Sequence, residues 1–136
     1  MKLTSTKYTD TQIGLGLLVV RVVAGLAMLI NHGIPKINNY NAMVEKWSHS
    51  FLGLPNHIQI YMIIFAEVVC AALIAAGLFT RLAAIPLIIG IGFAFFKASN
   101  GQIFGEGELA GIYLALFLAL FITGPGKYSV DNYLKK

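Results

Sequence analysis

The sequence predicts an all-α, multi-pass membrane protein whose fold is an antiparallel bundle of four transmembrane helices. Of its 136 residues, 57% are hydrophobic and only 12% are charged, whereas soluble domains carry roughly 25% charged residues. The apolar residues gather in four long stretches, which are typical of segments that cross the ~30 Å hydrocarbon core of a bilayer. The length suits a single domain over residues 1–136.

The four expected spans are joined by polar connections of different length. The spans cover about residues 13–34, 58–79, 82–97 and 108–123. Either the first span continues as helix toward Lys36, or Pro35 near its end terminates or kinks it. The short turn Thr80-Arg81 makes the second and third spans antiparallel neighbours. In the long first connection, Asn41 to Phe51 predicts a short amphipathic helix at the membrane interface, with Asn41 as its N-cap.

The alternative to a membrane protein is a soluble helical bundle. That fold needs polar positions along each helix, facing water. The stretch Gly111 to Ile122 offers none beyond Tyr113, so the membrane interpretation is favoured.

The basic residues outside the spans predict the orientation of the chain. Six of them lie in the terminal segments and in the turn at 80–81, namely Lys2, Lys7, Arg81, Lys127, Lys135 and Lys136. Three lie on the other side, at Lys36, Lys46 and Lys97. Because cytoplasmic segments carry an excess of Lys and Arg, both termini are expected in the cytoplasm. The net charge of +4 therefore reflects membrane orientation and not a nucleic-acid partner.

Two charged residues, Arg21 and Glu67, fall inside expected spans. An ionised side chain at the bilayer centre costs roughly 2.5–3.5 kcal/mol. Counting from the expected span ends, the two residues differ in depth by only ~4–5 Å. The sequence therefore predicts an intramembrane Arg21–Glu67 ion pair between the first two helices. Such a pair either fixes helix register or shapes a polar site or proton path, and both roles stay open.

A polar cluster is expected at the outer end of the bundle. On a helical wheel, Arg21 and His32 share the small-residue face of the first helix, with Lys36 close by. Small residues let helices approach closely, so this face should point inward. Glu108 heads a similar face in the fourth helix, with Gly111, Ala115 and Ala119.

The residues expected to gather at this outer end are His32, Lys36, Lys97, Glu106 and Glu108. A polar cluster over an apolar interior is a candidate binding site. The alternative is that these residues are ordinary interfacial anchors, and that Glu108 complements a helix dipole.

Neither a metal nor an intrinsic cofactor is expected. His32, His49 and His57 lack the close spacing of metal ligands. The single cysteine, Cys70, allows no internal disulfide and is expected to pack as a small apolar residue rather than act as a redox thiol.

An ordered set of short motifs resembles the DoxX family of membrane proteins. The first helix carries VRVVAG at 20–25 and NHGIPK at 31–36. The second carries AE at 66–67 and ends in AGLFTR at 76–81. The fourth begins with GELA at 107–110 and is followed by TGPGKYSVD at 123–131. The resemblance extends over roughly residues 14–131.

The resemblance implies a four-helix protein of the bacterial cytoplasmic membrane. The family is associated with thiosulfate:quinone oxidoreductase complexes and with membrane oxidoreductase systems that manage thiol and oxidative stress. Its polar pattern corresponds to Arg21, His32, Lys36, Glu67 and Glu108. After the third helix, Lys97 and Asn100 stand where many members carry a histidine.

Two functions follow as hypotheses. In the first, the chain is a quinone-linked redox subunit or accessory protein: the polar cluster hydrogen-bonds a membrane quinone and handles protons, and a partner redox protein supplies electrons. In the second, it is a non-enzymatic carrier of lipids or small molecules, or a membrane scaffold. Whether the chain is an enzyme stays open. Its many Gly and Ala residues also suit a homo-oligomer interface.

Overall fold

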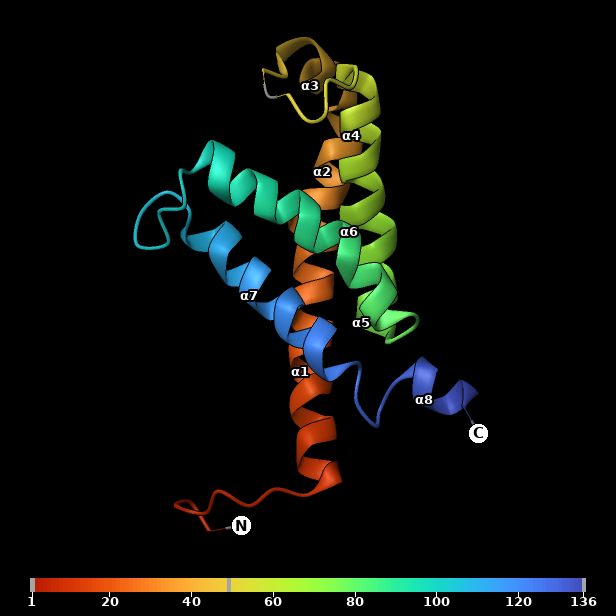
Figure 1. The fold of residues 1–136 in the computed structure, drawn as a ribbon. Helices are drawn as coiled ribbons and strands as arrows, with labels where there is room; N and C mark the ends of the chain where they lie inside the picture. The colour runs from red at the N-terminus through yellow and green to blue at the C-terminus, as the bar shows by residue number, and fades with distance from the viewer. Residues whose placement is uncertain (1, 49, 136) are drawn as a thin grey trace.

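The computed structural model describes residues 2–48 and 50–135, and these residues form helices joined by turns and loops (Figure 1). The expected all-α fold is confirmed. Three helices are long and apolar enough to cross a membrane, at Asp10–Asn38, Asn56–Ala76 and Thr80–Ala98. The fourth, α7 (Glu108–Thr123), is apolar but has 16 residues, which is about 24 Å of helix. Four antiparallel spans therefore remain a prediction.

The first long helix is continuous through α1 (Asp10–Met28), the π-helical turn η1 (Leu29–Gly33) and α2 (Ile34–Asn38). Thr9 starts it with a capping box to Gln12. Pro35 does not end this helix. Instead the wider turn η1, where the Ile34 N–H bonds to the Leu29 carbonyl, lies just before the proline, and helix continues for 29 residues in all.

The second long helix consists of α4 (Asn56–Ile64), the π-helical turn η2 (Phe65–Cys70) and α5 (Ala71–Ala76). It ends at Gly77, whose φ of 77° is the left-handed conformation that glycine adopts without strain. The third begins directly afterwards, as α6 (Thr80–Phe93) and the π-helical turn η3 (Ala94–Ala98).

The connection between the first two long helices differs from expectation. Its helix α3 covers Tyr40–Lys46, not residues 41–51, and begins after Asn39 without a side-chain cap. The helix stops early because the side-chain amide of Asn56 donates to the carbonyls of Val44 and Trp47, which would otherwise accept from a further turn.

The helices pack as two pairs. The first helix packs mainly on α5, and α6 packs mainly on α7, while α6 also lies beside η2 and α5. In Figure 1, the α6–α7 pair runs at a tilt across α1. The residues that fill the space between the pairs include Met28, Ile74, Leu87, Phe117 and Leu120, all buried.

Close contact between α1 and the second long helix depends on small residues. A Cβ at Gly25 would lie 2.8 Å from the carbonyl oxygen of Ala71, and a Cβ at Gly33 would lie 2.7 Å from that of Glu67. In α7 the expected small face is only partly confirmed: Gly111 is buried, but Ala115 and Ala119 are exposed. The rest of the buried face carries the large side chains of Tyr113, Phe117 and Leu120. The sequence does not reveal this face, because α7 is apolar on all sides.

Both termini lie at the same end of the helices as the turn at 77–79, and we call this the terminal end (Figure 1). The connection at 39–55 and the loop at 99–107 lie at the opposite end, the loop end. In the connection, Tyr40 stacks on Tyr61 with ring centroids 5.1 Å apart, and a side-chain hydrogen bond with Tyr61 raises the pKa of Tyr40.

Candidate functional site

Arg21 is buried at the terminal end of the helices, with a relative exposure of 2%. Its guanidinium donates to three backbone carbonyls: Nε to Ala75 at 3.3 Å, Nη1 to Pro125 at 2.7 Å and Nη2 to Tyr128 at 2.7 Å. These bonds attach the segment that follows α7 to α1 and α5. Arg21 therefore holds the chain together at this end.

Glu67 pairs with Lys36, whose Nζ lies 2.7 Å from Glu67 Oε2. The expected Arg21–Glu67 pair is therefore wrong. Helix register explains the difference: Gly33 lies against Glu67, whereas Arg21 bonds at the level of Ala75, which is about 12 Å further along the second helix. The first helix continues past Pro35 to Asn38, which brings Lys36 to the level of Glu67.

Two aromatic side chains complete the surroundings of this ion pair. His32 in η1 packs edge-on against Tyr113 of α7, with ring centroids 5.5 Å apart. His32 lies one helical turn before Lys36 on the first long helix. We call His32, Lys36, Glu67 and Tyr113 the polar junction. Three long helices supply these four residues. Tyr113 was not among the expected site residues, because a different face of α7 was expected to point inward.

The side chains of the polar junction are mostly buried. The relative side-chain exposure is 12% for Glu67 and 23% for Lys36, and Tyr113 is buried. The ion pair is short, but Glu67 Oε2 has no hydrogen bond of good geometry. The carboxylate therefore keeps capacity to accept a further donor.

Two π-helical turns meet at the polar junction. His32 belongs to η1 and Glu67 to η2, and these turns are in contact. Turns of this kind are rare and occur frequently at functional sites. Gly33 makes the contact possible, because any side chain there would meet the backbone of Glu67.

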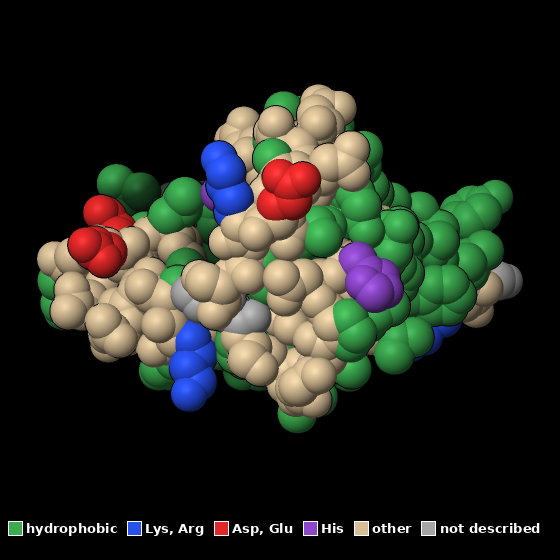
Figure 2. All heavy atoms as spheres, turned by 90° about the horizontal axis from the view of Figure 1, so that it is seen from above, with side chains coloured by type: hydrophobic (Ala, Val, Ile, Leu, Met, Phe, Trp, Pro, Cys, Tyr) green, Lys and Arg blue, Asp and Glu red, His purple; other side chains and the backbone are tan. Residues whose placement is uncertain are grey.

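The remaining residues of the expected cluster lie apart from the polar junction. Lys97 in η3, Glu106 in the following loop and Glu108 at the start of α7 are all exposed. Within residues 2–48 and 50–135, none of the three takes part in an ion pair. Figure 2 looks onto the loop end and shows charged side chains spread over this face rather than gathered in one patch.

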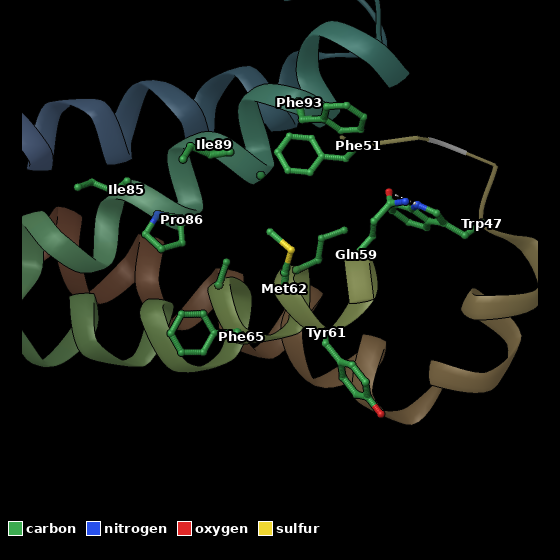
Figure 3. A pocket seen from close by; sticks show the side chains of 13 residues that line it. Trp47, Phe51, Gln59, Tyr61, Met62, Phe65, Ile85, Pro86, Ile89 and Phe93 are labelled. Atoms are coloured by element: carbon green, nitrogen blue, oxygen red, sulfur yellow. Dashed lines mark hydrogen bonds between the residues drawn. The ribbon is translucent and has the colours of Figure 1, made fainter. Parts of the chain in front are cut away.

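A second feature is a groove of about 490 Å³ between α4–η2 and α6, which we call the lateral groove. Side chains of the two helices face each other across it, and Trp47 and Phe51 of the connection lie at one end (Figure 3). Phe51 packs edge-on against Phe93 at 5.3 Å between centroids. The sequence did not predict this groove, which lies between two separate helices.

Comparison of the sequence with known proteins shows which family the chain belongs to. The sequence model of the DoxX family matches residues 16–100. The chain belongs to the DoxX family. A similar relative is an uncharacterized protein of Haemophilus influenzae, 38% identical over 73 residues. The match covers 48% of this chain and 54% of the relative, so the chain spans about half of the relative's length. No solved structure matches.

The DoxX match covers only part of the site. His32, Lys36 and Glu67 lie inside residues 16–100, as do the helices that form the lateral groove. Tyr113 and the segment bound by Arg21 lie beyond it. In the part of this DoxX protein that the structure describes, no cluster of three or more His, Cys, Asp or Glu residues is close enough to hold a metal ion.

Proposed function

We propose that this DoxX-family membrane protein is a quinone-linked subunit or accessory protein of a membrane oxidoreductase system. The polar junction would bind the quinone ring, and a partner redox protein would supply electrons. Its groups suit the ring carbonyls: the Lys36 ammonium and the Tyr113 hydroxyl are donors, and His32 both donates and accepts. Quinone reduction also consumes protons, and a histidine beside an ion pair is suited to deliver them.

The observation that supports this proposal is the mostly buried Lys36–Glu67 ion pair. An ion pair within apolar helices is expensive to form, and a structural lock already exists at the terminal end, where Arg21 bonds to three carbonyls. The pair also lies where two π-helical turns meet. A polar binding site accounts for both features together.

The test is direct measurement of bound quinone. Purified protein is equilibrated with a short-chain quinone, and the bound fraction is extracted and quantified for the wild type, Lys36→Met and Lys97→Met. We expect Lys36→Met to weaken binding by about tenfold or more, because it removes a charged hydrogen-bond donor. Lys97→Met is the matched control, since Lys97 is exposed and outside the junction. Equal binding by all three proteins, or none by the wild type, would contradict the proposal.

A second candidate function is a non-enzymatic carrier of lipids or small molecules. The lateral groove favours it, because the groove is apolar and lies on helices that are expected to face lipid. In that case the protein would bind a hydrophobic ligand without any effect of Lys36→Met.

A further inference from the structure

The lateral groove lies within the expected membrane region. Its walls come from α4, η2 and α6, which belong to two of the three helices able to cross a bilayer. Its rim is formed by exposed apolar side chains, among them Met62, Phe65 and Ile89 at 46%, 51% and 52% relative exposure. The groove therefore opens toward hydrocarbon and not toward water.

Among the described residues that line the groove, the polar side chains already have partners: Tyr61 stacks on Tyr40 and hydrogen-bonds to it. The side-chain amide in the groove belongs to Gln59, which is only 4% exposed. The Gln59 side chain donates to the Leu54 carbonyl at 2.7 Å and accepts from the indole of Trp47 at 3.0 Å. A head group or a peptide backbone placed here would leave its own polar atoms without partners, which is costly. The walls suit a pure hydrocarbon.

Two residues of α6 keep the groove open. Pro86 and Gly90 are one helical turn apart and both line it. A Cβ at Gly90 would have no neighbour within 4 Å. Glycine is unfavourable inside a helix, and at this position no close approach of another helix requires it, in contrast to Gly25 and Gly33.

One end of the groove is closed. The Trp47–Gln59 hydrogen bond and the Phe51–Phe93 contact lie together at the end toward the connection (Figure 3). A chain cannot easily enter from that end. It has to enter sideways, through the exposed rim between α4 and α6.

We infer that the lateral groove is a specific binding site for one acyl chain of a membrane phospholipid, which enters sideways from the bilayer. Acyl chains surround this rim in any bilayer, need no hydrogen-bonding partner and are flexible enough to follow a channel of this volume. The site is distinct from the polar junction: Ala66 lines the groove, whereas the adjacent Glu67 pairs with Lys36 of the first helix. The inference does not depend on quinone binding.

The test uses Trp47, the only tryptophan in the chain, as a reporter that lines the site. Protein in detergent is titrated with a phosphatidylcholine brominated deep in its acyl chain, and quenching of tryptophan fluorescence is recorded. We expect saturable quenching for the wild type, a partial loss for Gly90→Ala and at least a fivefold loss of affinity for Gly90→Leu, which fills the groove.

Gly16→Leu is the matched control. Gly16 is also a helical glycine with no neighbour near its Cβ, and it is exposed on α1. It should leave quenching unchanged. Folding of each variant is checked by circular dichroism, and Gly90→Ala, which adds one methyl group, keeps the test valid if Gly90→Leu does not fold.

Three results would overturn the inference. Equal quenching in the wild type and both Gly90 variants would mean non-specific lipid contact. Displacement of the brominated lipid by an isoprenoid alcohol at a far lower concentration than by unlabelled phospholipid would assign the site to an isoprenoid chain. A Gly90→Leu protein that changes from dimer to monomer in light scattering would make the groove an interface between copies.

Discussion

At the scale of single residues, two buried charges have separate roles. The sequence identified Arg21 and Glu67 as charges inside spans, but it paired them with each other. It had no means to find the true partners of Arg21, because backbone carbonyls carry no side-chain signature and two of them lie more than a hundred positions away. Lys36 was identified as part of a site, yet its pairing with Glu67 depended on helix continuing past Pro35.

Arg21→Met is expected to lower the free energy of unfolding by about 3–5 kcal/mol, because three backbone carbonyls lose the charged donor that the buried Arg21 supplies. Arg81→Met is the matched control: Arg81 also donates to two carbonyls, those of Phe121 and Ile122, but it is exposed. It should cost less than about 1 kcal/mol. Denaturation in mixed micelles, followed by circular dichroism, measures both. Equal losses would show that burial of Arg21 is not the decisive factor.

The Lys36–Glu67 pair can be separated into structural and functional parts. Lys36→Met alone should destabilise the fold by about 3 kcal/mol, because Glu67 is left as an uncompensated charge. The double variant Lys36→Met/Glu67→Leu should recover most of that loss, since both charges are removed. If the pair serves quinone binding, the refolded double variant still binds none. A double variant that stays unstable would make the pair a structural requirement.

At the scale of helices, the sequence predicted where the apolar helices lie along the chain, but not that they continue through π-helical turns. Hydrophobic stretches located all four apolar helices to within a few residues. The π-helical turns were missed because an inserted residue in a helix leaves no compositional signature, and the sequence alone does not decide whether helix continues past Pro35. The inner face of α7 was predicted only in part, and Tyr113 was therefore not among the expected site residues.

Gly33 is the residue that lets η1 and η2 touch. Gly33→Ala should destabilise the protein by about 1–3 kcal/mol, because the added methyl group meets the Glu67 backbone and overpacks the contact. Gly16→Ala, with open space around it, should be neutral or stabilising by up to about 1 kcal/mol, since alanine is the better helix former. Thermal unfolding of the two variants compares them. A tolerant Gly33→Ala would mean that the two turns can separate without cost.

At the scale of the whole molecule, α7 decides how many times the chain crosses the membrane. It is shorter than the other three long helices. Even so, α7 contacts the third long helix near both its first and its last turn. At the terminal end, Arg81 at the start of α6 donates to the last carbonyls of α7. Toward the loop end, Gly111 of α7 lies against Phe95 of η3. Because α6 and η3 together form a helix long enough to span, this pairing favours a crossing by α7 as well.

If α7 crosses the membrane, the loop at 99–107 and the C-terminal segment lie on opposite sides. In a Cys70→Ser background, a cysteine at Gln102 should react with a membrane-impermeant maleimide added to intact cells. A cysteine at Lys135 should react only after the cells are opened. Both positions are exposed, so reactivity reports the side of the membrane and not burial. Because basic residues are in excess at the terminal end, Lys135 is expected in the cytoplasm. Labelling of both cysteines from the same side would mean that α7 does not cross. The protein would then hold three spans, with Tyr113 reaching the polar junction from a helix that enters the membrane and does not leave on the other side.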